Sequence, residues 1–338
     1  MSDAWRAQRL ARLVDRRVQR LSLDLRGMSL LTECATGPYA ATALAGAAAG
    51  CAQVLAYGRD TAWGSLDEAR AWTLEVAGLL GVADRITVLE GLQPGHLQAA
   101  DIVTNSGHLR PLDAAKARHL RPGCVVPLMY EAWEVRPEDV DLRALAARGV
   151  PVVATNERHP EVDVFRFLGP MVVRALFEAG LEAMHNTVVL VCDNDFGPYI
   201  ESSLRGIGAH VTRELAGPAP DAIVVATTPG GEPWHPAKAN LAGTVVLQVF
   251  GDVDRPAVQA AGAVMLPPAE PPSGHMGVLP SSLGLDPIVR LQIASLKAAE
   301  VAHRALKSGA SVAEAVRRSE ESGYGQRLVD EAASGPGR

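Results

Sequence analysis

Short apolar runs alternate with segments of helical periodicity along almost the whole chain. The first half contains six runs that read as strands, at residues 29–35, 53–58, 86–91, 101–106, 125–130 and 151–156. The segments between them repeat apolar residues at helical spacing, near residues 38–49, 66–80, 112–119 and 138–147. Because strands separated by helices pair in parallel through right-handed crossovers, this alternation predicts an open, doubly wound sheet covered by helices.

The same alternation begins again after a helix that we expect at about residues 163–182. Five more apolar runs read as strands, at residues 187–194, 209–215, 221–228, 244–250 and 263–267. A long helical pattern at about residues 286–307 then leads back toward the first half of the chain. Beyond it, Ser311 followed three residues later by Glu314 predicts a capping box at the start of a short last helix.

These patterns predict two domains of the α/β class. The length of 338 residues fits two domains at a prior of about 150 residues each. We expect two Rossmann-like, doubly wound parallel sheets with a cleft between them. The first domain, Rossmann-like or flavodoxin-like, takes residues 1–165 and the returning helices in residues 285–330. The second, a degenerate nucleotide-binding domain, takes residues 166–284, and residues 331–338 should fray.

The composition argues against several kinds of partner. A formal net charge of −6 without a basic cluster makes nucleic acid an unexpected partner. The four cysteines form no C-x-x-C pair, so we expect neither a disulfide framework nor a structural zinc site. No apolar run reaches the ~18 residues of a membrane span, and the charged N-terminal segment lacks a signal peptide's apolar core. We therefore expect a cytoplasmic homodimer that binds a small-molecule substrate in biosynthesis.

The loop of the second domain that should hold a cofactor lacks two glycines. The stretch CDNDFGPY follows an apolar run in the register of the dinucleotide fingerprint G-x-G-x-x-G, with Gly197 as the third glycine. Cys192 and Asn194 occupy the first two positions, where glycine permits the tight turn and the approach of the pyrophosphate. Asp193 and Asp195 add negative charge there. Either they cap the helix themselves, or they bind a cationic or hydroxyl-rich group.

A second Gly-Pro-Tyr stretch starts at Gly37, 160 residues before Gly197. Both stretches read as strand, polar turn, Gly-Pro-Tyr and helix, and proline suits the first helical turn. An internal repeat or the convergence of two Rossmann-like units would explain the match. The candidate dinucleotide-binding residues come from CDNDFGPY and from the later strand end ATTPGG, and they are Asn194, Asp195, Phe196, Gly197, Thr227, Thr228 and Pro229.

Residues 100–300 resemble D-2-hydroxyacid dehydrogenases. The resemblance rests on ADIVTNSGHLRPLDAAKARHLRPGCVV, on DVDLRALAARGVPVVATNERHPEVDVF and on SGHMG. It implies an NAD- or NADP-dependent oxidoreductase that acts on a small polar carbonyl or alcohol in the cleft between the domains. It also implies that His275 takes the place of the catalytic histidine. The chain departs from the family at Phe250, which precedes Gly251 where the family has the arginine that binds the 2-oxo carboxylate.

Residues 28–130 also resemble class I S-adenosylmethionine-dependent methyltransferases. The segment ECATGPY is similar to their motif I, and VLAYGRD, GVADRITVLEG and AADIVTNSG follow in the family's order. Ala35 replaces a glycine of the family pattern. The resemblance implies that S-adenosylmethionine would bind at Glu33, Thr36, Gly37, Tyr39 and Asp60.

Polar residues follow several predicted strands of the first domain, where the ligand crevice of a parallel sheet lies. His108 and His275 are candidates for proton transfer because histidine titrates near neutrality, and Glu131 is a third catalytic candidate. The substrate-binding candidates are Ser106, Gly107, Tyr130, Glu134, Arg136, Asn156 and Glu157. The residues near Glu131 equally fit a solvated helix start, with Trp133 filling an interface. No metal is expected, since the histidines form no i,i+4 pair.

Three functions follow from these patterns. We expect an NAD(P)-dependent oxidoreductase first and an S-adenosylmethionine-dependent transferase second. A non-catalytic small-molecule-binding protein on a degenerate Rossmann frame is the third. The choice between NAD and NADP stays open, because Arg213 and Glu214 near the end of one strand favour opposite cofactors.

Overall fold

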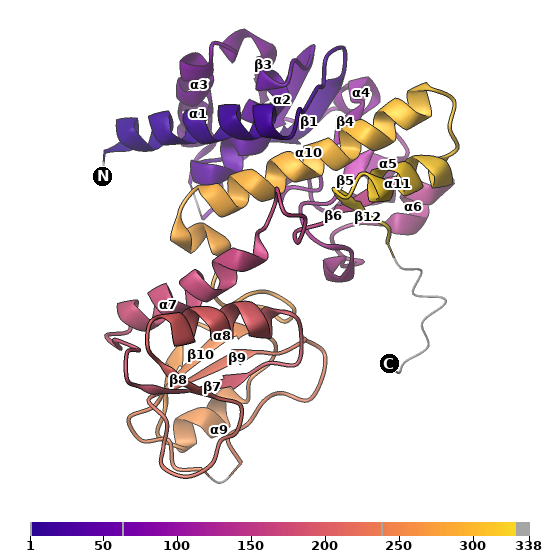
Figure 1. Cartoon of the computed structure of the whole chain (residues 1–338). Helices are drawn as coiled ribbons and strands as arrows, with labels where there is room; N and C mark the ends of the chain where they lie inside the picture. The colour runs from indigo at the N-terminus through magenta and orange to yellow at the C-terminus, as the bar shows by residue number, and fades with distance from the viewer. Residues whose placement is uncertain (1, 63, 238, 329–338) are drawn as a thin grey trace. The chain divides into compact units, whose positions relative to one another are not determined.

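The computed structural model of the chain describes residues 2–62, 64–237 and 239–328 (Figure 1). Residues 331–338, for which we expect fraying, lie outside these ranges. Every helix within the described ranges is too short or too polar to cross a lipid bilayer.

The chain divides into two compact units. Unit 1 comprises Met1–Asp163 and Leu285–Arg338, and unit 2 comprises Val164–Gly284. Both units alternate strands with helices, and all but one of their strands pair in parallel. This arrangement confirms the predicted α/β class with two Rossmann-like sheets.

Unit 1 is built on two sheet segments that meet edge to edge. The segment β3-β2-β1-β4 joins the segment β5-β6-β12 through a parallel bridge between Ile102 and Val125. The order 3-2-1-4-5-6 is that of dinucleotide-binding Rossmann folds, and β12 adds an antiparallel edge strand that the sequence patterns do not predict. The strands are β1 (Ser29–Glu33), β2 (Gln53–Tyr57), β3 (Ile86–Leu89), β4 (Ile102–Val103), β5 (Val126–Pro127), β6 (Val152–Thr155) and β12 (Gly325–Gln326).

Local capping signals fix the helices of unit 1. Ser65 and Glu68 form a capping box at the start of α3, and Gly81 ends this helix with a φ of 70°. At α11 the predicted box is only half formed: Ser311 Oγ accepts from Glu314 N, whereas the Glu314 carboxylate pairs with two arginines of its own helix. The helices are α1 (Asp3–Arg20), α2 (Ala41–Ala48), α3 (Leu66–Leu80), α4 (Pro94–Ala99), α5 (Ala114–Ala117), α6 (Leu142–Ala147), α10 (Asp286–Lys307) and α11 (Val312–Glu321).

The long helix α10 crosses the sheet of unit 1, where it packs on α1, α2, β5 and β6 (Figure 1). Near the carboxyl ends of the strands, Ser295 Oγ donates to Leu128 O at 3.0 Å and lies 2.5 Å from Thr155 Oγ1. Near the amino ends, the His303 ring lies 3.0 Å from Gly123 O. The helix therefore contacts the sheet near both the carboxyl and the amino ends of its strands, through buried polar side chains.

Unit 2 holds one five-stranded parallel sheet in the order β11-β10-β9-β7-β8. In chain order this is 2-1-3-4-5, the flavodoxin-like arrangement. Residues 213–221 connect β8 to β9 without a helix or a strand. The sheet therefore ends at β8, whereas a full Rossmann sheet has a third strand beyond this position. The elements are β7 (Thr187–Val191), β8 (His210–Thr212), β9 (Ala222–Ala226), β10 (Val245–Phe250), β11 (Val264–Leu266), α7 (Leu168–Glu178), α8 (Phe196–Gly206) and α9 (Arg255–Ala260).

Candidate functional site

The topological switch point of unit 1 lies between β1 and β4. The chain leaves β1 toward β2 on one side, whereas β4 continues to β5 on the other. Open α/β sheets bind ligands in the crevice at the carboxyl ends of two such strands. In unit 1 these ends carry Glu33, which closes β1, and Ser106 to His108, which follow β4. The predicted residues Glu33, Ser106, Gly107 and His108 thus meet at one place.

The Glu33 carboxyl is enclosed at this switch point. The side chain is 7% exposed, and the backbone N–H of His108 donates a hydrogen bond to it. A Cβ atom on Gly107 would lie 1.8 Å from Glu33 Oε2, so any larger residue would displace the Glu33 carboxyl or the β4 loop. Burial raises the pKa of Glu33 to about 7, and Arg110 opposes this shift. Glu33 therefore exchanges its proton near neutral pH.

His108 stands beside Glu33 and is half-buried. Its ring meets Tyr57 edge to face, with 6.3 Å between the centroids. Burial lowers the pKa of His108, and Arg59 adds to this effect. The imidazole is therefore neutral at pH 7 and can accept a proton. A neutral histidine whose backbone N–H binds a titrating carboxyl suits general acid–base chemistry.

A chain of buried, hydrogen-bonded hydroxyl groups connects the loop after β4 to β1. Thr104 Oγ1 donates to Thr32 Oγ1 at 2.8 Å and lies 2.7 Å from Ser106 Oγ. Asn105 Oδ1 accepts from Met129 N at 2.9 Å, and its buried Nδ2 has no partner among the described residues. Ser106 is 3% exposed, so its hydroxyl belongs to this interior network.

The predicted catalytic residue Glu131 follows β5 and is 1% exposed, and its carboxylate is bound by several side chains of the protein. Its carboxylate accepts from Trp133 Nε1 at 2.8 Å and from Gln326 Nε2 at 3.0 Å. It also pairs with Arg158 at 3.5 Å. These contacts fix the loop after β5 against the C-terminal strand β12. Trp133, Arg158 and Gln326 were not among the predicted site residues.

Two further carboxyl groups lie near Glu131. Burial raises the pKa of Glu134 to about 7; the backbone N–H of Glu131 opposes this shift, and the Glu131 charge adds to it. Burial also raises the pKa of Glu157 well above its ordinary value, with Glu134 and Glu131 contributing. The structure therefore brings three predicted residues into one buried acidic cluster. Within the described ranges, no group of three or more such side chains has a geometry that could hold a metal ion.

Two other predicted substrate residues of unit 1, Arg136 and Asn156, have partners within the protein, whereas the Tyr130 hydroxyl has none among the described residues. Arg136 pairs with Asp139 at 3.6 Å, and Asn156 Nδ2 donates to Gly323 O at 2.8 Å. The Tyr130 hydroxyl is buried without a partner among the described residues. The Arg110 guanidinium lies over the Tyr130 ring, 5.6 Å from its centroid.

The loops after β1 and β2 carry the residues that the methyltransferase resemblance singles out. Gly37 opens a 3-10 helix, and its carbonyl accepts from Trp72 Nε1 at 2.9 Å. Asp60 Oδ1 accepts from Leu66 N at 2.8 Å, which ties it to the start of α3. Tyr39 is 36% exposed. The structure places all of these residues along one stretch of the sheet edge: Glu33, Thr36, Gly37, Tyr39 and Asp60.

The turn between β7 and α8 in unit 2 is filled by its own side chains. Asn194 Oδ1 accepts from Phe196 N at 3.1 Å, and Asn194 Nδ2 donates to Ala226 O at 3.0 Å. Asp195 precedes α8 without a side-chain cap bond. Of the two alternatives for the aspartates, the helix cap is not observed: Asn194 Oδ1, not an aspartate, accepts from the first N–H of α8. Phe196 is 6% exposed and packs in the core.

Two features of this unit still fit a nucleotide. Gly197 lies in the first turn of α8, where a Cβ atom would be 3.0 Å from Arg213 Nη2. Arg213 reaches this point from the end of β8 and pairs with Glu201 at 2.7 Å. Cationic side chains near the second strand of a nucleotide-binding unit can accommodate a ribose phosphate.

Two other features oppose an anionic ligand there. Asp193 Oδ1 accepts from Thr228 N at 2.8 Å, and Asp252 Oδ2 accepts from Gly230 N at 3.2 Å. A Cβ atom on Gly251 would lie 2.1 Å from Thr227 Oγ1, so this loop packs tightly on its neighbour. The predicted residues Thr227, Thr228 and Pro229 thus form a loop whose backbone donors are partly occupied by carboxylates.

The loop that carries His275 is held by a buried arginine. Arg255 is 6% exposed; its Nη1 donates to Gln248 Oε1 at 2.9 Å, and its Nη2 donates to Pro267 O at 2.7 Å. The backbone N–H of His275 donates to Pro272 O at 3.0 Å. His275 belongs to unit 2 and His108 to unit 1. Arg255 lies five residues after Phe250, and its hydrogen bonds stabilise the fold. No motif in the sequence indicates this structural role.

Three solved structures are similar to this chain. A dipicolinate synthase chain from Bacillus halodurans has a TM-score of 0.49 and 10% identity, covering 80% of this chain and 96% of its own. A dipicolinate synthase chain from Bacillus subtilis has a TM-score of 0.48 and 11% identity, covering 85% and 98%. NAD-dependent formate dehydrogenase from Staphylococcus aureus, in complex with NAD, has a TM-score of 0.41 and 12% identity, covering 78% and 91%.

Dehydrogenases are therefore among the similar structures, as the resemblance of residues 100–300 predicts. No family model matches the chain, and no curated protein matches it. Because the three TM-scores are below 0.5, we assign no cofactor and no residue from these neighbours.

Proposed function

We propose that the chain is an NAD- or NADP-dependent oxidoreductase that acts on a small polar carbonyl or alcohol. The observation that carries this proposal is the pair of His108 and Glu33 at the switch point of unit 1. A dehydrogenase must move one proton at the oxygen of its substrate for each hydride transferred. A neutral, half-buried histidine can take that proton.

In the direction of alcohol oxidation, the neutral ring of His108 accepts the hydroxyl proton. The bound nicotinamide supplies the hydride acceptor. Glu33 holds the loop of His108 through the backbone N–H and acts as a positioning residue. We propose that this carboxyl, whose pKa is raised to about 7, serves His108 as a proton reservoir. His275 remains a second candidate for the proton transfer.

Unit 2 would hold the dinucleotide, with Gly197 at the helix start and Arg213 near the adenosine end. Asp193 in the loop after β7 accepts hydrogen bonds from Thr228 in the loop after β9. These bonds have to break before the phosphates can approach the donors of Thr228. Arg213 favours NADP, because an additional phosphate on the ribose would meet its guanidinium.

Thermal-shift titrations of the full chain test this function. NAD(H) and NADP(H) should raise the melting temperature, whereas S-adenosylmethionine and S-adenosylhomocysteine should not. A shift by only the last two would overturn the proposal in favour of the transferase. His108→Ala should then abolish turnover over a panel of small 2-hydroxy acids and keep the dinucleotide shift. His119→Ala, in the same unit, is the matched control and should retain turnover.

A second function is favoured by one observation, the hydrogen bonds from Thr228 to Asp193. A loop closed by its own carboxylate suits a small-molecule-binding protein without redox chemistry. On this alternative no dinucleotide would shift the melting temperature, and a small cationic ligand would. The two functions therefore give opposite results in the same titration.

A further inference from the structure

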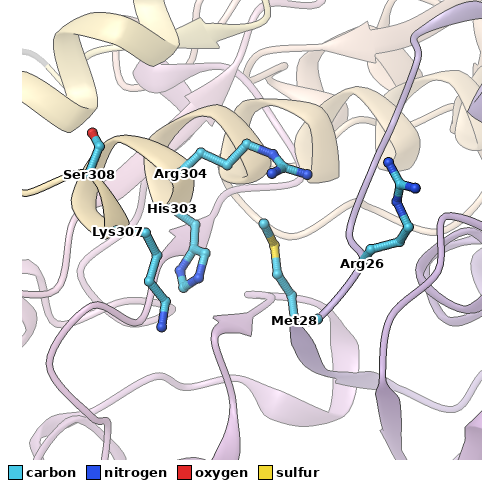
Figure 2. Close-up of a pocket in the computed structure, with 7 residues that line it drawn as sticks. Arg26, Met28, His303, Arg304, Lys307 and Ser308 are labelled. Atoms are coloured by element: carbon cyan, nitrogen blue, oxygen red, sulfur yellow. The ribbon is translucent and has the colours of Figure 1, made fainter.

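A pocket of about 380 Å³ lies at the amino edge of the unit 1 sheet (Figure 2). Met28 in this pocket directly precedes β1, whose other end carries Glu33. A five-residue strand is about 13 Å long from first to last Cα, so the pocket is separate from the switch point. The pocket is lined by the segment before β1 and the last turns of α10: Arg26, Gly27, Met28, His303, Arg304, Lys307 and Ser308.

One carboxylate fixes two arginines beside this pocket. Asp24 accepts from Arg26 Nε at 2.8 Å and from Arg26 Nη2 at 2.9 Å. It also pairs with Arg304 Nη2 at 2.9 Å. Each guanidinium keeps its Nη1 without a partner among the described residues. Two planar cations are therefore held by two carboxylates, since Arg304 also pairs with Glu300 through its Nε at 3.0 Å.

Lys307 adds a third cation that has no ion pair or hydrogen bond within the described part of the chain. It follows Arg304 by three residues on α10, so both side chains lie on one face of the helix. Figure 2 shows them on either side of His303. Glu300, the nearby carboxylate, already accepts from Lys297 Nζ at 2.8 Å and from Arg304 Nε at 3.0 Å. The pocket therefore has an excess of positive charge.

The remaining wall includes His303 and Met28, and both side chains are buried. The His303 ring uses both nitrogens, one 3.0 Å from Gly123 O and the other 3.3 Å from Asp101 Oδ1. Met28 is 5% exposed and presents an apolar surface. The stem of Arg26 lies across Gly50, where a Cβ atom would be 2.7 Å from Arg26 Cγ. Packing thus contacts the stem of Arg26, whereas its guanidinium is exposed to solvent and is held by Asp24.

We propose that this pocket binds an anion of the phosphate type, either free or carried by a small metabolite. Guanidinium and ammonium donors recognise phosphate oxygens through charge-assisted hydrogen bonds. Cations at a helix C-terminus also favour the helix dipole, which accounts for Arg304 and Lys307. The helix dipole does not account for Arg26. This residue comes from the segment before β1, lines the same pocket and is bound to Asp24. The apolar surface of Met28 leaves room for the organic part of a phosphomonoester.

Calorimetric titration of the full chain at low ionic strength tests this site, with inorganic phosphate and with glycerol 3-phosphate as probes. Lys307→Gln and Arg26→Gln should each weaken binding by about tenfold, because each removes one charge-assisted donor. Both side chains are accessible to solvent, so the variants should fold. Arg143→Gln, which removes an exposed arginine of α6, is the matched control and should bind as the parent chain does.

The outcomes separate cleanly. Binding of either probe that is lost in both pocket variants and kept in the control supports the site. A tighter fit for glycerol 3-phosphate identifies a phosphorylated metabolite as the source, and equal affinity identifies free phosphate. Absence of binding to the parent chain, or equal affinity in all four proteins, would overturn the proposal. None of these results depends on dinucleotide binding in unit 2.

Discussion

Asp193 and Thr228 are joined by two hydrogen bonds, from the backbone N–H at 2.8 Å and from Oγ1 at 3.1 Å, both to Oδ1 of the aspartate. These bonds tie the loop after β7 to the loop after β9, on either side of the unit 2 switch point. In a dinucleotide-binding unit the donors of such loops face phosphate groups. Here a carboxylate takes two of them, which makes Asp193 the main electrostatic obstacle to a nucleotide.

Removing this charge should improve dinucleotide binding. We expect Asp193→Asn to raise the affinity for NADPH by about fivefold, because a solvent-exposed like charge costs roughly 1 kcal/mol. Asp193→Ala should raise it further by freeing both donors of Thr228. Calorimetric titration measures both effects. Weaker NADPH binding by either variant would show that Asp193 supports the dinucleotide instead of opposing it.

The close approach of Gly107 to Glu33 should make a side chain at position 107 costly. In Gly107→Ala the new Cβ would collide with Glu33 Oε2 at 1.8 Å, so the buried Glu33 carboxyl or the β4 loop has to move. We expect a loss of about 2 kcal/mol from overpacking, together with loss of activity. Gly78→Ala is the matched control, since nothing lies within 4 Å of its added Cβ inside α3. The control should be neutral or slightly stabilising in urea unfolding.

The helix and strand pattern could be predicted because its signals are local. The predicted helices at residues 66–80 and 286–307 match α3 and α10, and for α3 the cause is visible in Ser65, Glu68 and Gly81. Alternating apolar runs likewise located the strands. These features depend on neighbours within a few positions, so no tertiary contact is needed to predict them.

The environment of the site residues could not be predicted because it depends on distant segments. Gln326 meets Glu131 across 195 positions, and the two-residue strand β12 that brings it there has no periodicity of its own. The burial of Glu33 likewise depends on the loop after β4. The sequence therefore indicated which residues gather at the strand ends, whereas their hydrogen-bond partners came from the fold.

Arg255 should control the order of the loop that carries His275. In Arg255→Met the carbonyls of Pro267 and Pro268 would lose their donor, at a cost of about 3 kcal/mol. Arg255→Lys should recover only part of this loss, because one ammonium cannot reproduce the fork of a guanidinium. Hydrogen exchange should show faster exchange at the Gly277 amide, which donates to Val249 O in the parent chain. Unchanged exchange in the methionine variant would exclude this role.

Glu33 should make the stability of the chain depend on pH in an unusual direction. Its folded-state pKa is raised to about 7 from an ordinary value of 4.5. The folded chain therefore keeps the Glu33 proton between these values, whereas the unfolded chain loses it. Because the folded state then binds more protons, the contribution of Glu33 to stability falls as the pH rises through this window. The total change is about 3 kcal/mol.

Glu33→Gln isolates this effect, because the amide oxygen can still accept from the N–H of His108 and the side chain no longer titrates. We expect the variant and the parent chain to have similar urea midpoints at pH 4, and the variant to be more stable by up to about 3 kcal/mol at pH 8. Other buried carboxyl groups such as Glu134 cancel in this difference, since both proteins contain them. Glu75→Gln, at an exposed position of α3, should show the same small difference at both pH values. A Glu33→Gln difference that is equally independent of pH would mean that the Glu33 carboxyl is ionised in the folded chain, and Glu33 could then not supply a proton reservoir to His108.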